Sequence, residues 1–366
     1  MKIKYMIILK SFLKMNMINL ESPSNMSKWW NFGALLSLFM IIQISSGFFL
    51  SMFYINNINY TFNSIININR NINNGWLIRS IHMNGASFIF IYMYIHMSRS
   101  LYFNSFFLKQ TWISGMMIFI TMMMTAFMGY ILPWGQMSFW GATVITNLLS
   151  TIPYLGNMIT NWLWGGFSIN NATLLRFYSF HFILPFMIMS LIMIHIMFLH
   201  YSKSNNPLNL NYYDMISLFP YFLIKDMNFF MMSMFIFIMN CLLKPYFFTD
   251  PENFIPSNPL NTPIHIQPEW YFLFAYTILR TIPNKLGGVI ALSMSIISLL
   301  TLPMINFIKM NSSKFNPLMK INFWMFSMNF LMLSWMGTQP IEIPFININQ
   351  FLTFMYFMFF ILKFTY

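Results

Sequence analysis

Charged side chains are the scarcest feature of this sequence. Asp, Glu, Lys and Arg make up only 7% of the 366 residues, whereas an ordinary soluble domain contains about 25%. So few charges cannot form a hydrated shell around a chain of this length, and 58% of its residues are hydrophobic. The composition therefore excludes a soluble fold and predicts an all-α integral membrane protein.

Cysteine is almost absent as well, because Cys241 is the single one. One cysteine cannot form an internal disulfide, a four-cysteine iron–sulfur or zinc site, or a covalent haem attachment through Cys-x-x-Cys-His. Any redox cofactor must therefore be held by other ligands.

Apolar segments of about 20 residues recur along the chain, each long enough to cross ~30 Å of hydrocarbon. Two connections between them, 133–173 and 244–286, are long and rich in proline, glycine or tryptophan, so we expect short interfacial helices there. The eight predicted spans are 32–53, 76–102, 112–132, 174–200, 227–243, 287–307, 320–337 and 346–364.

The net charge of +12 would suggest nucleic-acid binding in a soluble chain, but in a membrane protein it must be assigned to the two sides. If all eight segments cross, thirteen of the nineteen Lys and Arg residues lie on the side of the N-terminus. The positive-inside rule then places the N-terminus on the electrically negative side and both long connections on the positive side. We expect an amphipathic surface helix within residues 1–27.

Four of the six histidines form two pairs with one interval. His82 and His96 lie 14 residues apart in the second span, and His181 and His195 lie 14 residues apart in the fourth. On a helix, 14 residues leave a rotation of about 40° and a rise of about 21 Å, so each pair shares a face. The spacing predicts two bis-histidine sites at two membrane depths.

Glycines repeat this interval in the first and third spans, as Gly33 and Gly47 and as Gly115 and Gly129. Glycine lets a flat macrocycle or another backbone approach closely. A buried histidine bonded across helices, or simple helix packing, would explain one such residue but not four helices that share an interval. Two imidazoles per level leave zinc or copper under-coordinated, whereas haem iron needs two axial ligands.

Two arginines accompany the histidines. Arg79 precedes His82 by three residues, and Arg99 follows His96 by three, each toward the nearer membrane surface. A guanidinium group there can pair with a haem propionate. The alternative is an arginine that extends to the membrane interface.

Longer motifs accompany the four histidines. They are Trp30-Asn31-Phe32-Gly33, Gly129-Tyr130-Ile131-Leu132-Pro133-Trp134-Gly135-Gln136, Trp140-Gly141-Ala142-Thr143-Val144-Ile145-Thr146-Asn147 and Pro268-Glu269-Trp270-Tyr271-Phe272-Leu273-Phe274-Ala275-Tyr276. With these motifs the chain resembles, over nearly its whole length, mitochondrial cytochrome b, the family at the membrane core of the quinol–cytochrome c reductase complex, complex III. The resemblance implies a surface segment 1–31, a di-haem four-helix bundle 32–204 and a C-terminal domain 205–366.

The resemblance also implies the cofactors and the assembly. A low-potential haem b would lie between His82 and His181, and a high-potential haem b between His96 and His195. The subunit would act only within complex III, with the Rieske iron–sulfur subunit, cytochrome c1 and other subunits. That complex would be a homodimer in the lipid of the mitochondrial inner membrane, and the N-terminus would face the matrix.

In the family, ubiquinol is oxidised near the positive-side haem, which gives Glu269 the role of quinol contact and proton acceptor. A carboxyl group beside apolar aromatic residues has a raised pKa, which suits a general base. The other residues that the resemblance places in this pocket are Tyr130, Phe127, Gly141, Ile145, Pro268, Phe272 and Tyr276.

Quinone reduction would take place at the negative side. The resemblance implies that His200 and Asp226 contact the quinone and that Lys225 supplies protons. The family often has serine where this chain has Ala34. His265 has no assigned role.

Two other functions stay open at this stage. One is a di-haem subunit of another quinone-linked dehydrogenase, against which the quinol-site motif argues. The other is a proton or ion transporter that uses intramembrane His and Arg side chains. A transporter would lack strong visible absorption, so a haem spectrum separates the two classes.

Overall fold

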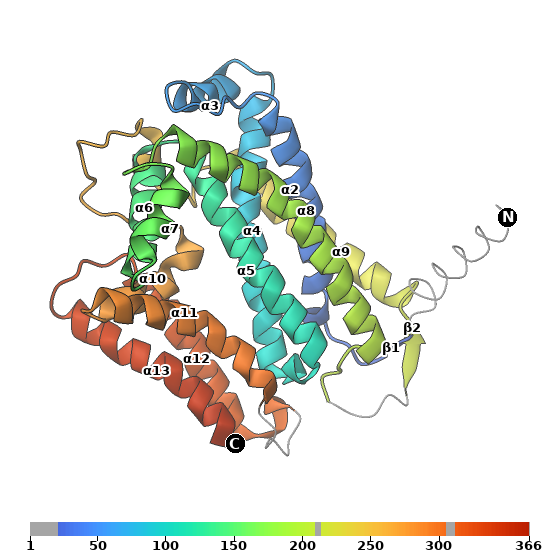
Figure 1. The fold of residues 1–366 in the computed structure, drawn as a ribbon. Helices are drawn as coiled ribbons and strands as arrows, with labels where there is room; N and C mark the ends of the chain where they lie inside the picture. The colour runs from blue at the N-terminus through green and yellow to red at the C-terminus, as the bar shows by residue number, and fades with distance from the viewer. Residues whose placement is uncertain (1–20, 209–213, 305–311, 366) are drawn as a thin grey trace, which may run out of the picture.

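The computed structural model describes residues 21–208, 214–304 and 312–365. A long helix forms at each of the eight apolar segments that the sequence predicts as membrane spans (Figure 1). Residues 1–20, where most of the expected N-terminal surface helix falls, lie outside the described residues. The long helices are α2 (Phe32–Ser51), α4 (Gly75–Tyr102), α5 (Lys109–Ile131), α8 (Asn171–Ser202), α9 (Tyr221–Leu243), α11 (Lys285–Thr301), α12 (Pro317–Met336) and α13 (Phe345–Thr365).

Within the described residues, six segments are long and apolar enough to cross a membrane. Helices α4 and α12 are also long enough, at 28 and 20 residues, but do not join this group. Several of their polar side chains are covered by protein: Ser80, Asn84 and Ser87 of α4 and Asn329 of α12 are buried. Their membrane crossing therefore stays a prediction. The six segments are Lys28–Ser51, Lys109–Ile131, Asn171–Ser202, Tyr221–Leu243, Lys285–Met304 and Phe345–Lys363.

The first four long helices form a bundle in which α2 packs on α4 and α5 packs on α8. Helix α9 packs against α4 and α2, whereas the C-terminal group α10 (Leu273–Thr281), α11, α12 and α13 meets the bundle where α11 packs on α5 and α12 on α4. Aromatic rings fill the contact between α9 and the bundle: Phe39 stacks on Phe88 at 5.6 Å between ring centroids, and Phe237 of α9 meets both rings edge-on. Such pairs add to the stabilisation that apolar burial gives.

Both long connections contain the short helices that their composition predicts. The first holds α6 (Gln136–Asn147) and α7 (Gly156–Trp164), and the second holds α10 and two 3-10 turns, Pro251–Phe254 and Trp270–Phe272. The connections are bonded to each other, because the Ser138 hydroxyl donates to Asn253 Oδ1 at 2.7 Å.

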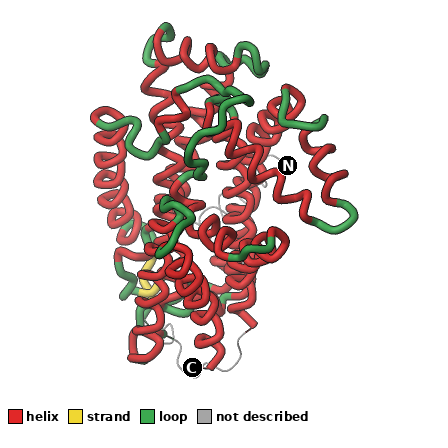
Figure 2. Tube along the Cα trace, turned by 90° about the vertical axis from the view of Figure 1, so that its left-hand side faces the viewer, coloured by secondary structure: helices red, strands yellow, loops and turns green. Residues whose placement is uncertain are grey.

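One helix and one strand pair were not expected from the sequence. Helix α3 (Thr61–Arg70) lies at one end of the bundle and packs on α4, and strands β1 (Glu21–Pro23) and β2 (Met215–Ser217) pair antiparallel at the other end (Figure 1). These strands have three residues each, too few to show an alternating pattern. Figure 2 shows how small this sheet is beside the helices. An ion pair between Lys203 and Glu21, 3.1 Å long, lies beside it.

Asparagine side chains start three of the long helices. Asn170 forms a capping box with Thr173 at the start of α8, Asn284 accepts from two backbone N–H groups at the start of α11, and Asn316 does so at the start of α12. These side-chain oxygens accept hydrogen bonds from backbone N–H groups that have no partner within the helix, and so they fix where each helix begins.

Candidate functional site

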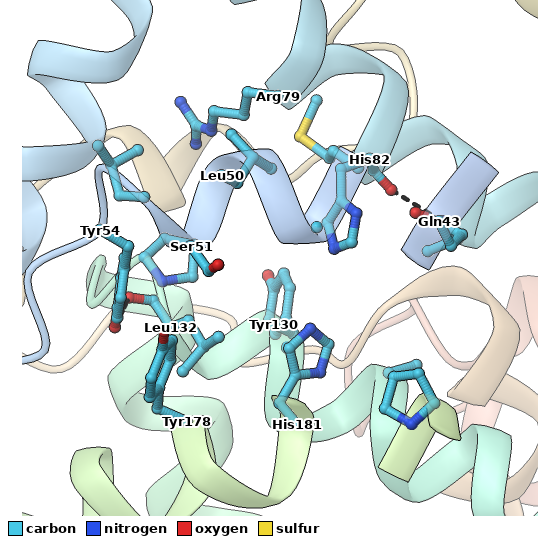
Figure 3. Close-up of a pocket in the computed structure, with 18 of the residues that line it drawn as sticks. Gln43, Leu50, Ser51, Tyr54, Arg79, His82, Tyr130, Leu132, Tyr178 and His181 are labelled. Carbon is cyan, nitrogen blue, oxygen red and sulfur yellow. Dashed lines mark hydrogen bonds between the residues drawn. The ribbon is translucent and has the colours of Figure 1, made fainter. Parts of the chain in front are cut away.

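The four histidines of equal spacing meet as two facing pairs. The ring centroids of His82 and His181 lie 6.1 Å apart, and those of His96 and His195 lie 6.5 Å apart. The first pair comes from α4 and α8 and points into a common space (Figure 3). A metal-bound imidazole nitrogen lies about 2 Å from its ion, so each pair leaves room for one metal atom between the rings. After the sides that the sequence predicts, we name His82 and His181 the positive-side level and His96 and His195 the negative-side level.

Each of the four glycines lies against one of these rings. A Cβ atom on Gly47 would lie 2.8 Å from His82 Cε1, and a Cβ atom on Gly129 would lie closer still to His181. At the negative-side level the same atom would be 3.3 Å from His96 for Gly33 and 3.1 Å from His195 for Gly115. The repeated glycines therefore make space for the imidazole rings, and the fit is tighter at the positive-side level.

Serines orient one histidine at each level. His82 Nδ1 lies 3.0 Å from Ser46 Oγ, and His195 Nδ1 lies 3.0 Å from Ser114 Oγ. The Ser46 hydroxyl donates its proton to the carbonyl of Ile42 at 2.7 Å, so it must accept from the ring. The Ser114 hydroxyl also donates to a carbonyl of its own helix, at 3.0 Å. Both rings then carry a proton on Nδ1, which leaves the Nε2 lone pair free for a metal.

The other two histidines differ from each other. His181 Nδ1 lies 2.8 Å from the carbonyl oxygen of Thr125, which can only accept, so this ring too has a free Nε2. His96 Nδ1 is buried, and among the described residues it has no hydrogen-bond partner. Within the same residues no three His, Cys, Asp or Glu side chains gather at one point. Each level thus offers two imidazoles, the set that haem iron requires.

One cavity of about 630 Å³ connects the positive-side level with the proline-rich connection. Its size is typical of small-molecule sites, which measure about 300–1,000 Å³. Figure 3 shows the imidazoles of His82 and His181 at this cavity together with Arg79 and Tyr130. Further lining residues are Gln43, Gly47, Tyr54, Gly129, Tyr178, Asp250, Glu269 and Tyr271.

Glu269 is the acidic group that the motif predicted for this place. Burial raises the pKa of its carboxyl group to about 8, and the negative charge of Asp250 adds to the effect. Asp250 is itself held in place, since it accepts from the side chain of Gln267 at 3.0 Å. A carboxyl group with a pKa near working pH, in a cavity of this size, can accept a proton from a bound ligand.

Tyr130, which was also predicted for the quinol site, lines this cavity, but the other predicted residues do not. The Tyr276 hydroxyl donates to the Ile266 carbonyl at 3.0 Å, and the Arg280 guanidinium lies 4.9 Å from its ring. A Cβ atom on Gly141 would meet nothing within 4 Å. Their part in a quinol site stays a prediction, as it does for Phe127, Ile145, Pro268 and Phe272.

The two arginines occupy different surroundings. Arg79 lines the cavity beside His82. Arg99 is enclosed near His96, with its guanidinium 5.2 Å from the ring of Trp30. Its Nε has no hydrogen-bond partner among the described residues, and no carboxylate there pairs with it. A buried cation without a counter-ion is costly, so an anionic group at this place would stabilise it.

The residues predicted for quinone reduction lie near the ends of two helices, at the side that the sequence predicts to be negative. His200 is in the last turn of α8, and Lys225 and Asp226 are near the start of α9. The Lys225 ammonium donates to the carbonyl of Met26 at 2.7 Å, and the Asn31 amide donates to the Lys225 carbonyl at 3.3 Å. The start of α2, which carries Ala34, is therefore bonded to the start of α9.

Some site residues were missed from the sequence, although a signal existed for two of them. Ser46 and Ser114 each directly precede one of the repeated glycines, so the same interval could have indicated them. Gln43, Tyr54 and Asp250 carry no comparable pattern. His265 remains without a role: its Nε2 is buried and has no partner within the described part of the chain.

The comparisons with known proteins agree with this geometry. Residues 17–203 match the family model Cytochrome b/b6/petB, and residues 256–357 match the model Cytochrome b(C-terminal)/b6/petD. The chain belongs to the cytochrome b family. As a cytochrome b it is a b-type cytochrome with several membrane helices. It is also similar to a solved structure titled "Hyperthermophilic respiratory Complex III", with a TM-score of 0.91 and 30% identity over 98% of this chain and 97% of that one.

Proposed function

We propose that this cytochrome b is the membrane core of a quinol–cytochrome c oxidoreductase. It would oxidise ubiquinol at the positive side and reduce quinone at the negative side. One observation carries the proposal: a single cavity contains both the His82–His181 pair and the Glu269 carboxyl group. An electron-accepting site and a proton-accepting group then lie in one space, as quinol oxidation requires. The solved Complex III structure of similar fold supports the assignment.

The histidines would hold two non-covalent haem b groups. His82 with His181 and His96 with His195 present facing rings, and three of these four have a free Nε2. Arg79 and Arg99 are the guanidinium groups available for the haem carboxylates. When bound, the two haems would supply a one-electron path across the membrane, from the low-potential positive-side level to the high-potential negative-side level.

Glu269 would take a proton from ubiquinol at the positive side. Its raised pKa leaves the carboxyl group largely protonated at pH 7 and able to accept a proton as the pH approaches 8. Tyr130 and Asp250 line the same cavity and would contact the ring or a bridging water. Proton release on this side and uptake on the other would couple the reaction to proton translocation.

Quinone reduction would use the cluster at the negative side. His200 and Asp226 would contact the quinone, and Lys225 would supply protons from the water at this surface. The bonds from Lys225 to Met26 and from Asn31 to Lys225 hold the start of α9 against the start of α2. This arrangement supports a site bordered by α2, α8 and α9.

The assembly is also part of the proposal. The chain has one cysteine and cannot itself hold an iron–sulfur cluster or a covalent haem, so outgoing electrons require other subunits. We propose a Rieske iron–sulfur subunit and cytochrome c1, in a homodimeric complex of the mitochondrial inner membrane. The N-terminus would face the matrix, in line with the excess of Lys and Arg on that side.

A haem spectrum of the purified complex tests the proposal. The dithionite-minus-ferricyanide difference spectrum should show two b-type haems, and the complex should reduce cytochrome c with ubiquinol as donor. Absence of a b-haem band in intact protein would favour an ion transporter. Two haems without cytochrome c reduction would favour a subunit of another quinone-linked dehydrogenase.

A further inference from the structure

Helix α4 carries a polar stripe on the face opposite its histidines. With about 100° per residue, the members of the stripe share one face, and His82 and His96 lie about 180° away from it. Successive members of the stripe are 4, 3 and 7 residues apart. Its members are Ser80, Asn84, Ser87 and Tyr94.

The stripe binds the C-terminal half of the chain. The Ser80 hydroxyl donates to the Cys241 carbonyl at 3.2 Å, and the Asn84 amide donates to the Pro245 carbonyl at 2.8 Å. A polar group on a membrane helix needs such partners, because hydrocarbon offers none. This explains why α4 is less apolar than its neighbours.

Two members of the stripe reach the segment Glu269–Phe272. The Tyr94 hydroxyl donates to the Tyr271 carbonyl at 2.5 Å, and the Trp270 indole donates to Ser87 Oγ at 3.1 Å. Between them, the ring of Phe90 stacks on Tyr271 with centroids 4.0 Å apart and planes 3° apart. Two hydrogen bonds and one stacked ring pair thus fix this segment to α4.

The same segment determines where Glu269 points. The Phe272 N–H donates to the Glu269 carbonyl at 2.8 Å and closes a single 3-10 turn over Trp270–Phe272. Glu269 is the residue directly before this turn, and it lines the cavity. The turn runs directly into α10 at Leu273, so α10 holds its far end, and the contacts with α4 hold the part that follows Glu269.

We propose that Tyr94 and Ser87 are positioning residues, which fix the segment Glu269–Phe272 and thereby aim the Glu269 carboxyl group into the cavity. The proposal rests on the proposed quinol oxidation and adds two residues that no motif of the quinol site contains. Through them, the helix that carries two haem ligands also sets the geometry of the proton acceptor.

The test is Tyr94→Phe in the assembled complex, with Tyr92→Phe as the matched control. Tyr92 is on the same helix, is buried, and shares a hydrogen bond of 2.5 Å with Ser233 of α9 rather than with the segment at Glu269. Each variant loses one buried hydroxyl group and keeps its ring. The measurements are kcat and KM for ubiquinol oxidation, the two b-haem bands and the Tm of the complex.

We expect Tyr94→Phe to lower kcat/KM about tenfold, mainly through KM, because the freed Tyr271 carbonyl is left buried without a donor. Both haem bands should stay, and Tyr92→Phe should keep kcat/KM within about twofold of the parent. Equal kinetics in the two variants would overturn the inference.

Ser87→Ala provides a second, independent variant. It removes the other bond to the segment and should also raise KM with both haem bands retained. If the complex with Tyr94→Phe does not assemble, Ser87→Ala tests the inference alone, and an unchanged KM for ubiquinol would overturn it. Loss of haem in both variants would show a general structural role instead. A parent complex that does not oxidise ubiquinol would overturn the proposed function itself, whereas an active parent with unaffected variants overturns only this inference.

Discussion

The two histidine levels share one design but differ in their surroundings. Both place two imidazoles from α4 and α8 face to face, with a glycine of α2 or α5 against each ring. At the positive-side level, both Nδ1 atoms have an acceptor and an open cavity adjoins the rings. At the negative-side level, His96 Nδ1 has no partner among the described residues, and a buried Arg99 lies nearby.

This difference indicates how one repeated unit can serve two tasks. A ring that donates from Nδ1 to an acceptor is a more electron-rich ligand, which favours the oxidised metal and lowers the reduction potential. Each level has an arginine nearby, Arg79 beside His82 and Arg99 near His96, so the arginines do not distinguish the levels. If haems bind as proposed, the missing acceptor at His96 would favour the higher potential at the negative-side level, the direction in which electrons would cross the membrane.

Removal of one ligand from each level should have the largest effect. We expect His181→Leu to abolish the lower-potential b haem and His195→Leu to abolish the higher-potential one, because a single imidazole cannot hold a six-coordinate haem iron. A redox titration of the b-haem absorbance distinguishes the two. Retention of both bands in either variant would contradict the pairing of histidines.

Glu269→Gln should impair the positive-side reaction alone. Loss of a general base costs about 10²-fold or more in rate, so quinol oxidation should fall by roughly this factor while both haem bands remain. Quinone reduction at the negative side, followed through the higher-potential haem, should continue. Unchanged turnover would remove Glu269 from the mechanism.

The pH dependence of quinol oxidation follows from the same carboxyl group. Burial raises the pKa of Glu269 to about 8, so the ionised form is the unfavourable one and only becomes abundant as the pH rises. The rate should therefore increase about tenfold per pH unit below pH 8 and then level off. In Glu269→Gln this rise should disappear. A parent profile that is flat between pH 6 and 8 would show that another group accepts the proton.

Glycine substitutions compare how tightly the two levels are packed. Gly129→Ala should destabilise the protein by about 1–3 kcal/mol and reduce the lower-potential haem, because the new methyl group overlaps the His181 ring. Gly33→Ala is the matched control, since its methyl group would lie 3.3 Å from His96 and needs only a small shift. Thermal unfolding measures the loss of stability in each variant, and the b-haem absorbance measures the loss of haem. Equal losses in the two variants would mean that the levels are packed alike.

Serine substitution should give the smallest effect. Ser46→Ala removes the acceptor of His82 Nδ1, so we expect the reduction potential of the lower-potential haem to rise by about 60 mV or less. This shift is equivalent to roughly a tenfold change in the relative affinity of the site for oxidised and reduced haem. Ser114→Ala makes the same change at His195 and should raise the higher potential instead. A potentiometric titration measures both, and a shift of the wrong haem would contradict the assignment of levels.

Much of the fold could be predicted because membrane helices leave a simple record in the sequence. Runs of about 20 apolar residues located the eight long helices, and the interval of 14 located the histidines that face each other, since both depend on the fixed rise of an α-helix. The three-residue strands β1 and β2 and the ten-residue helix α3 left no such record. The strands form only because a partner distant in the sequence pairs with them, as Ser217 does with Glu21, whereas α3 packs on the neighbouring helix α4.

The sequence by itself determined the membrane class, the two levels, the four histidines and the glycines that accompany them. Each of these depends on composition or on a spacing within one helix. Only the tertiary structure decided that each glycine faces a ring, that the cavity at His82 extends to Glu269, and that Tyr94 holds the segment beside Glu269. These features join residues that are distant in the sequence, such as Tyr94 and Tyr271, which are 177 positions apart, and a helical period carries no information about which helices will be neighbours.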